Sequence, residues 1–108
     1  MTRQKTKRAR LKAAGWRFGS ARDLLELTDE DVEFIEIKLA LADELKRRRQ
    51  AEGLTQAQCA ERVGSSQSRV ARMESVDPTV TLDLLIRALL ALGATRRDMG
   101  AILGRKAA

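Results

Sequence analysis

The sequence predicts an all-α fold, for two reasons. Hydrophobic residues make up 44% of the chain but aromatic residues only 3%, and there is a single proline. Strands are richer in aromatic and β-branched residues, so this composition favours helices. Apolar side chains also recur at helical spacing in five segments, most of which begin after a Ser or Thr and end before a glycine. With 108 residues, the chain is long enough for one domain with a modest core.

The N-terminus is expected to be a basic flexible arm over residues 1–15. The first 22 residues carry eight Lys or Arg and no acid, a pattern typical both of arms that bind nucleic-acid phosphates and of solvated tails. The sequence leaves these two interpretations open. Trp16 and Phe18 then mark the start of a helical domain over residues 16–108, and Ser20 predicts a short helix that ends at Leu27.

A long helix is predicted from Asp29 to Glu52, capped by Thr28 and ended by Gly53. Acidic residues crowd its first turns and Lys or Arg its last turns, which complements the helix dipole. Two apolar stripes lie on nearly opposite sides of this helix, one formed by Phe34, Ile37, Leu41 and Leu45 and the other by Val32, Ile35, Leu39 and Ala42. Its first half is therefore expected to lie between two partners, which are either the N-terminal segment and the main core, or a second chain.

Two short helices follow, over residues 56–63 after Thr55 and over residues 67–74 after Ser66. The turn between them contains Gly64, and its length matches a helix-turn-helix over residues 55–74, whose second helix enters the DNA major groove. Val70 and Met73 are expected to anchor this second helix inward. Its outward face then carries Gln67, Ser68, Arg69 and Arg72.

The outward face of the second helix suits the edges of DNA bases. Glutamine binds adenine through two hydrogen bonds, and arginine binds guanine in the same way. A helix N-terminus such as the one at Ser66 receives a phosphate through its free N–H groups. The alternative is an ordinary solvated face, since Ser, Gln and Arg are common on surfaces. The turn and the core pattern together favour the first interpretation.

The segment LTQAQCAERVGSSQSRVARME resembles the helix-turn-helix of the Cro/C1-type (XRE) repressors, and the flanking segments LTDEDVEFIEIKLALADEL and TLDLLIRALLALGA resemble those of HigA-like antitoxins within that family. The resemblance implies a five-helix, lambda-repressor-like domain that binds double-stranded DNA at a palindromic operator. The positions that would contact base edges are Gln67, Ser68 and Arg72, and those that would contact phosphates are Gln56, Ser66 and Arg69. The resemblance also implies a structural ion pair between Arg49 and Glu74.

Two more helices are predicted at the C-terminal end, over residues 82–92 after Thr81 and over about residues 96–103. The first of them is apolar around more of its circumference than one core requires. We therefore expect the segment 81–103 to form a homodimer interface, made by Ile86, Leu90, Met99 and Ile102. The alternative is that the last helix folds back over Ile86 and Leu90 within one chain.

The composition excludes several classes of function. The chain has no histidine and a single cysteine, Cys59, so one chain cannot build a disulfide or a structural zinc site, and neither metal nor cofactor is expected. The absence of histidine, of tyrosine and of a glycine-rich phosphate loop argues against an enzyme. No apolar run approaches the roughly 20 residues of a membrane span, so a cytoplasmic protein is expected.

Two classes of function remain, and both are transcriptional repressors. The resemblance favours an antitoxin that represses the operon it shares with a small, basic RNase toxin. The segment 23–37, with seven acids and no base, has the charge to neutralise such a partner. These acids are equally well explained as the start of a helix. The other class is a stand-alone or phage-derived repressor whose only protein partner is a second copy of itself.

Overall fold

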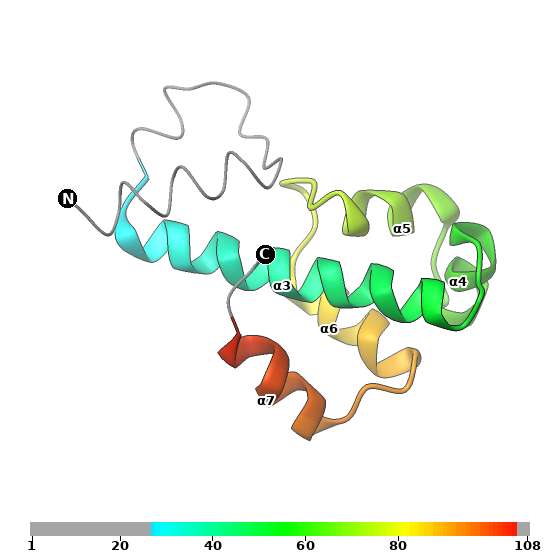
Figure 1. Cartoon of the computed structure of the whole chain (residues 1–108). Helices are drawn as coiled ribbons and strands as arrows, with labels where there is room; N and C mark the ends of the chain where they lie inside the picture. Colours follow the sequence, from blue (N-terminus) through cyan, green and yellow to red (C-terminus); the bar gives the residue numbers. More distant parts are fainter. Residues whose placement is uncertain (1–26, 106–108) are drawn as a thin grey trace.

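The computed structural model describes residues 27–105, which form five α-helices and no strand. The helices are α3 (Asp29–Ala51), α4 (Gln56–Val63), α5 (Gln67–Glu74), α6 (Leu82–Ala91) and α7 (Arg96–Gly104) (Figure 1). The all-α prediction is confirmed, and each of these helices starts where the sequence predicts and ends within one residue of the expected position. The predicted basic arm and the short helix before Leu27 lie outside the described residues.

A side-chain cap fixes the start of each described helix. At α3, the Thr28 hydroxyl accepts a hydrogen bond from the Asp31 N–H, and the Asp31 carboxylate accepts one from the Thr28 N–H, both at 3.1 Å. The same reciprocal capping box occurs at Thr55 of α4 and at Thr95 of α7. Each cap satisfies N–H groups that have no carbonyl partner within the helix, and such a cap is worth about 1 kcal/mol.

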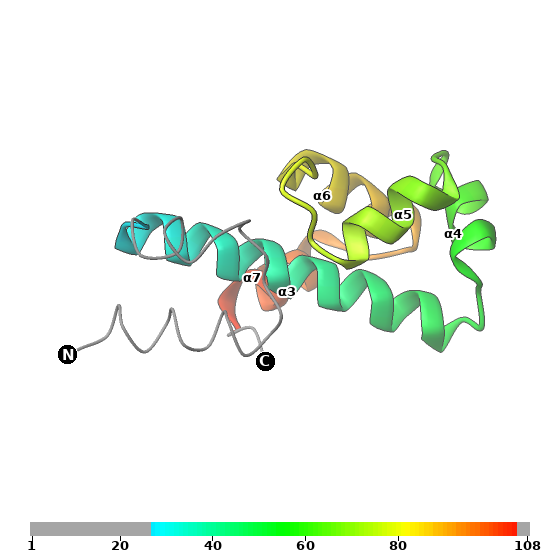
Figure 2. The same ribbon diagram turned by 90° about the horizontal axis from the view of Figure 1, so that it is seen from above.

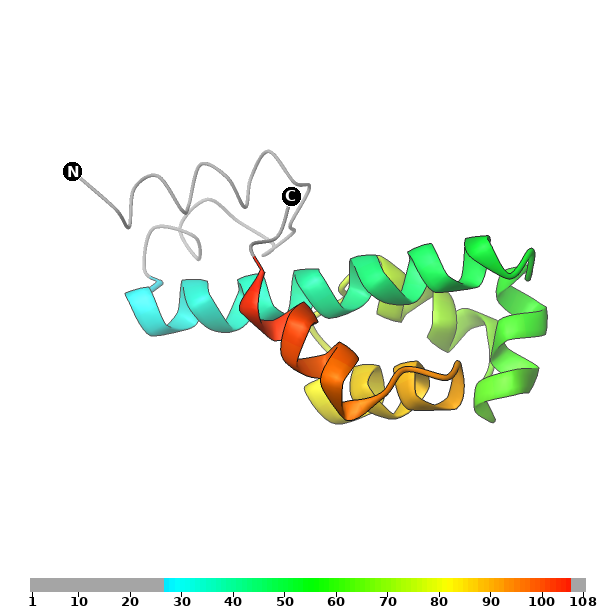
Figure 3. The same cartoon turned by 60° about the horizontal axis from the view of Figure 1, so that its bottom comes forward.

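Helix α3 is the central element of the fold. Helices α5, α6 and α7 pack against it, and α7 crosses it (Figure 3). Its first turns project beyond α4, α5 and α6 (Figure 2). Both predicted stripes are buried in the middle of α3, where Leu41 and Leu45 of one stripe and Leu39 and Ala42 of the other are at most 6% exposed. Phe34, at the start of the first stripe, is instead 49% exposed.

The core lies between α3 and the shorter helices. Val70 and Met73 of α5 are 0% and 2% exposed, so they anchor this helix as predicted. Leu85 and Leu89 of α6 are both fully buried. Burial of one such side chain contributes about 1.5–3 kcal/mol, which fixes the orientation of α5 relative to the rest of the domain.

The position of helix α7 differs from one part of the predicted dimer interface. Ile102 is 2% exposed and belongs to the core of a single chain, so its assignment to a dimer interface is wrong. The physical reason is that α7 packs on α3, where the Arg105 guanidinium also donates a hydrogen bond to Glu44 at 2.7 Å. Met99 is half-buried against the same core. Leu90 of α6 is nevertheless 48% exposed, so the last helix does not cover it.

Candidate nucleic-acid interface

The turn between α4 and α5 is closed by its own backbone. Gly64 adopts a left-handed conformation with φ of 71°, which residues with a side chain rarely tolerate. The Ser65 N–H then donates to the Ala60 carbonyl at 2.8 Å and ends α4. Ala60 is 3% exposed, and its small side chain lets the two helices approach each other closely. The result is a short, rigid connection that sets the direction of α5.

The outward face of α5 is polar and accessible. Gln67, Ser68, Arg69 and Arg72 are all exposed, whereas Val70 and Met73 are buried. The Ser66 hydroxyl caps the helix by accepting a hydrogen bond from the Arg69 N–H at 3.2 Å, and it lies 3.3 Å from the Ser68 hydroxyl. Of the four side chains named for DNA contact from α5, Gln67, Ser68 and Arg69 therefore lie in its first turn, and Arg72 lies in its last turn, four residues after Ser68.

A chain of hydrogen bonds connects this face to the interior. The Arg49 guanidinium donates to both carboxylate oxygens of Glu74, at 2.6 and 3.1 Å. Gln56, the first residue of α4, donates to the same carboxylate at 3.2 Å. The Gln56 side-chain oxygen in turn accepts a hydrogen bond from the Gln67 amide at 2.8 Å. Gln67 is thus held by a network that reaches from α3 through α5 and α4.

The Arg49–Glu74 pair is the fixed end of this network. The Glu74 side chain is 5% exposed and that of Arg49 is 13% exposed, so water screens the pair only weakly. The hydrogen bond to Glu74 raises the pKa of Arg49. Arg49 also donates to the Leu54 carbonyl at 2.8 Å. A carboxylate near a helix C-terminus is unfavourable to the dipole, and the cationic partner explains why Glu74 is stable there.

Among the described residues, the two arginines of the outward face, Arg69 and Arg72, have no ion-pair partner, unlike several other arginines of the domain. Arg62 pairs with Glu52 at 2.8 Å, and Arg87 pairs with Asp83 at 3.0 Å. Across residues 27–105, by contrast, the side chains of Arg69 and Arg72 form no ion pair or hydrogen bond. Their guanidinium groups remain available for an anionic or base-edge partner.

Comparison with known protein families decides the nature of this site. A family model described as a helix-turn-helix domain matches residues 40–101, which is more than half of the chain. The chain belongs to this helix-turn-helix family. The match runs from the middle of α3 into α7 and includes α4, the turn and α5. The family is consistent with the resemblance to Cro/C1-type repressors and makes the chain a DNA-binding regulator. Comparisons with curated proteins and with solved structures found no match.

The sequence did not predict the hydrogen bonds that Gln56 makes within this helix-turn-helix protein. The resemblance assigned Gln56 and Gln67 separate contacts to DNA, but the two side chains are bonded to each other and, through Gln56, to Glu74. Gln67 lies eleven residues after Gln56 and Glu74 eighteen residues after it, so helical periodicity gives no signal for either bond. A side-chain amide at the first position of both helices was the only hint in the sequence.

Three further observations concern features other than the DNA face of the helix-turn-helix protein. Cys59 is 1% exposed, and burial raises the pKa of its thiol, which makes it a poor nucleophile. Between residues 27 and 105, no group of three or more His, Cys, Asp or Glu side chains is placed to hold a metal ion. In the same part of the chain, no helix has both the length and the apolar character needed to cross a membrane.

Proposed function

We propose that this DNA-binding regulator is a sequence-specific transcriptional repressor, without catalytic activity, that binds a palindromic operator as a homodimer. The observation that carries the proposal is the network from Arg49 through Glu74 and Gln56 to Gln67. It holds the Gln67 side chain in place at the start of α5, the helix that also carries the exposed Ser68 and Arg72. A side chain that is already ordered loses little entropy when it binds a base edge, which favours sequence-specific recognition over general attraction to phosphate.

The outward face divides into two kinds of DNA contact. Gln67, Ser68 and Arg72 read base edges, because amide, hydroxyl and guanidinium groups match the donors and acceptors in the major groove. The phosphate contacts come from the flanks of this patch and are made by Gln56, Ser66 and Arg69. This arrangement predicts that Arg72→Ala costs about 1–3 kcal/mol of binding free energy and relaxes the choice of base at one position.

The dimer would be formed through α6 and the exposed side of α7. Leu90 is 48% exposed although large and apolar, and Ile86 and Met99 are half-buried beside the core. A two-fold dimer of this kind places its recognition helices in successive major grooves, about 34 Å apart. Sedimentation velocity tests this with Leu90→Glu, which should shift a dimer to a monomer. The control is Ala91→Glu, which is also at an exposed position of the same helix.

Selection from a random duplex library tests the proposed DNA recognition. We expect the wild-type chain to enrich a palindromic sequence and to bind it about 1,000-fold or more tightly than random duplex at physiological salt. Gln67→Ala and Arg72→Ala should reduce affinity for this sequence, whereas Arg97→Ala, which removes an exposed charge from α7, should not. Enrichment of no sequence, or equal losses in all three variants, would contradict sequence-specific recognition.

A second role, as the antitoxin of a toxin–antitoxin pair, is favoured by the acidic end of α3. Asp29, Glu30 and Asp31 are exposed there, next to the half-exposed Phe34. This end projects away from α4 and α5 (Figure 2), so a partner bound to it leaves the DNA face open. An acidic surface with an apolar side chain suits a small, basic RNase toxin.

Affinity capture of the tagged chain from its native host tests the antitoxin role. The wash should contain nuclease and high salt, so that bridging nucleic acid is removed. Recovery of a stoichiometric small basic protein supports the antitoxin role if a doubly substituted variant, Asp29→Lys with Glu30→Lys, loses it. Asp83→Lys, at the exposed start of α6, is the control. Recovery of only untagged copies of the chain supports a stand-alone repressor instead.

A further inference from the structure

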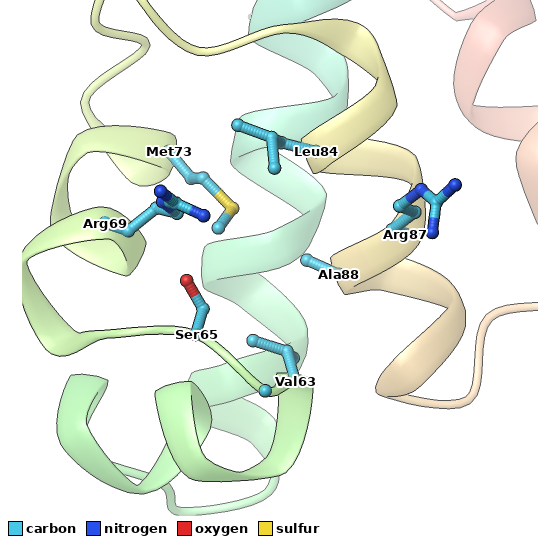
Figure 4. A pocket seen from close by; sticks show the side chains of 8 residues that line it. Val63, Ser65, Arg69, Met73, Leu84, Arg87 and Ala88 are labelled. Carbon is cyan, nitrogen blue, oxygen red and sulfur yellow. The ribbon is translucent and has the colours of Figure 1, made fainter.

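A cavity of about 260 Å³ lies between the turn after α4, the recognition helix α5 and α6. Its apolar wall includes Met73 of α5 with Leu84 and Ala88 of α6 (Figure 4). Its polar lining includes Ser65 of the turn and Arg69 of α5. This cavity is distinct from the outward face of α5 that carries Gln67, Ser68 and Arg72, but Arg69 borders both.

Ser65 contributes a hydrogen-bonding group that the protein does not use. Its hydroxyl oxygen is buried, and it is the one buried side-chain polar atom between residues 27 and 105 that has no hydrogen-bond partner. Figure 4 shows this oxygen pointing from the turn toward Arg69 and Met73. An unsatisfied buried hydroxyl is costly, and native proteins keep few of them. A small shift of the side chains around it would let a ligand in the cavity satisfy it.

The charge at the cavity is positive. The Arg69 side chain extends from α5 toward Met73 (Figure 4) and forms no ion pair or hydrogen bond within the described part of the chain. Arg87 of α6 also borders the cavity, but its guanidinium points away from it and pairs with Asp83 at 3.0 Å. Both members of that pair are more than two-thirds exposed, at 76% and 70%. Such a pair holds Arg87 only weakly, so its guanidinium can turn toward an anion.

We propose that this cavity binds a small organic carboxylate that carries one aromatic ring. The carboxylate pairs with the Arg69 guanidinium and accepts a hydrogen bond from the Ser65 hydroxyl. The ring lies against Leu84, Ala88 and the thioether of Met73, which packs favourably on aromatic rings. The volume is sufficient, since benzene enters an engineered apolar cavity of about 150 Å³.

Ligand binding would also regulate DNA binding, and this consequence rests on the proposed function. Arg69 is one of the proposed phosphate contacts, and a carboxylate paired with its guanidinium neutralises that contact. The ligand and the operator then each lower the affinity of the protein for the other, by the same factor. The cavity is thus a site through which a metabolite relieves repression.

Binding of benzoate to the full chain without DNA tests the site itself. Benzamide has nearly the same shape but no charge, so its affinity should be about tenfold weaker, as expected when a charge-assisted hydrogen bond is lost. Arg69→Gln should weaken benzoate binding by about tenfold and leave benzamide unaffected. Ser65→Ala should weaken benzoate binding several-fold. Arg97→Gln is the matched control, since it removes another exposed arginine, from α7, and should change nothing.

The amide spectrum from nuclear magnetic resonance locates the bound ligand. Benzoate should shift the signals of residues 63–69 and 84–88, and loss of these shifts in Arg69→Gln supports the proposal. Equal affinities for benzoate and benzamide, or shifts confined to other helices, would overturn it. DNA binding is then measured separately with and without benzoate. A protein that binds benzoate in the cavity but selects no DNA sequence refutes the proposed repressor and leaves the ligand site intact.

Discussion

The stability of the domain should depend on the ionisation of Glu44 in α3. This side chain is 3% exposed and accepts hydrogen bonds from the guanidinium groups of Arg47 at 3.0 Å, Arg48 at 2.7 Å and Arg105 at 2.7 Å. The bond from Arg47 contributes most, and together the three arginines lower the pKa of Glu44 to about 2, although burial opposes the shift. Since Arg105 follows α7, the carboxylate also fastens α7 to α3.

The size and pH dependence of the Glu44 contribution to the free energy of unfolding follow from its pKa. Its value falls from 4.5, the ordinary value of a glutamate, to about 2 in the folded protein. A carboxyl group with a lowered pKa stabilises the fold fully above pH 4.5, and this contribution is lost as the pH falls toward 2. At about 1.4 kcal/mol for each pH unit, the contribution is about 3 kcal/mol.

Urea unfolding between pH 2.5 and pH 6 measures this contribution. The wild type should be more stable than Glu44→Gln at pH 6, and most of the difference should disappear by pH 2.5. Asp83→Asn is the control, because this exposed acid pairs only with the exposed Arg87 and should leave the pH dependence unchanged. If Glu44→Gln does not fold, the carboxyl resonance of Glu44 in the wild type gives its pKa directly. A stability difference that is equal at pH 2.5 and pH 6, or a Glu44 pKa near 4.5, would show that the three arginines do not stabilise the Glu44 carboxylate.

Three further predictions concern the recognition helix and the arm. Glu74→Gln leaves the largely buried Arg49 without its carboxylate and should lower the free energy of unfolding by about 3 kcal/mol in urea titrations. Gly64→Ala forces alanine into a left-handed turn and should lower stability by about 1 kcal/mol in thermal unfolding. Gly100→Ala, inside α7 with open space around it, should raise stability in that assay. Deletion of residues 1–12 should weaken binding to all duplexes alike and flatten its dependence on salt concentration; a changed sequence preference would instead mean that the arm reads bases.

Most of the fold could be predicted because the boundaries of its helices are set by residues close to each helix end. The caps at Thr28, Thr55 and Ser66 act within three residues of each helix start, so their hydrogen bonds are encoded in short stretches of sequence. The glycine after α4 acts equally locally, through its backbone conformation. Where a segment was assigned to a helix, its inward side could also be predicted from spacing alone, as for Val70 and Met73.

The features that could not be predicted join segments far apart in the chain. Glu44 bonds to Arg105, which lies 61 residues later, and nothing in either local pattern indicates that they meet. Ile102 has the same spacing whether it faces its own core or a second chain, so sequence could not decide between them, and the structure places it in the core. Val76 has a φ of 56° although it is β-branched and buried, a conformation that is rare for such residues. Only the packed domain determines these three features.

We propose that the outward face of α5 reads base edges, with Gln67 held in place before DNA binds. The most direct measurement is the affinity of the wild type and of Arg72→Ala for every single base-pair variant of the selected operator. Arg72→Ala should lose discrimination at one base pair in each half-site and keep it at all others. A uniform loss of affinity with unchanged discrimination at every position would show that Arg72 contacts only phosphate and does not read a base edge.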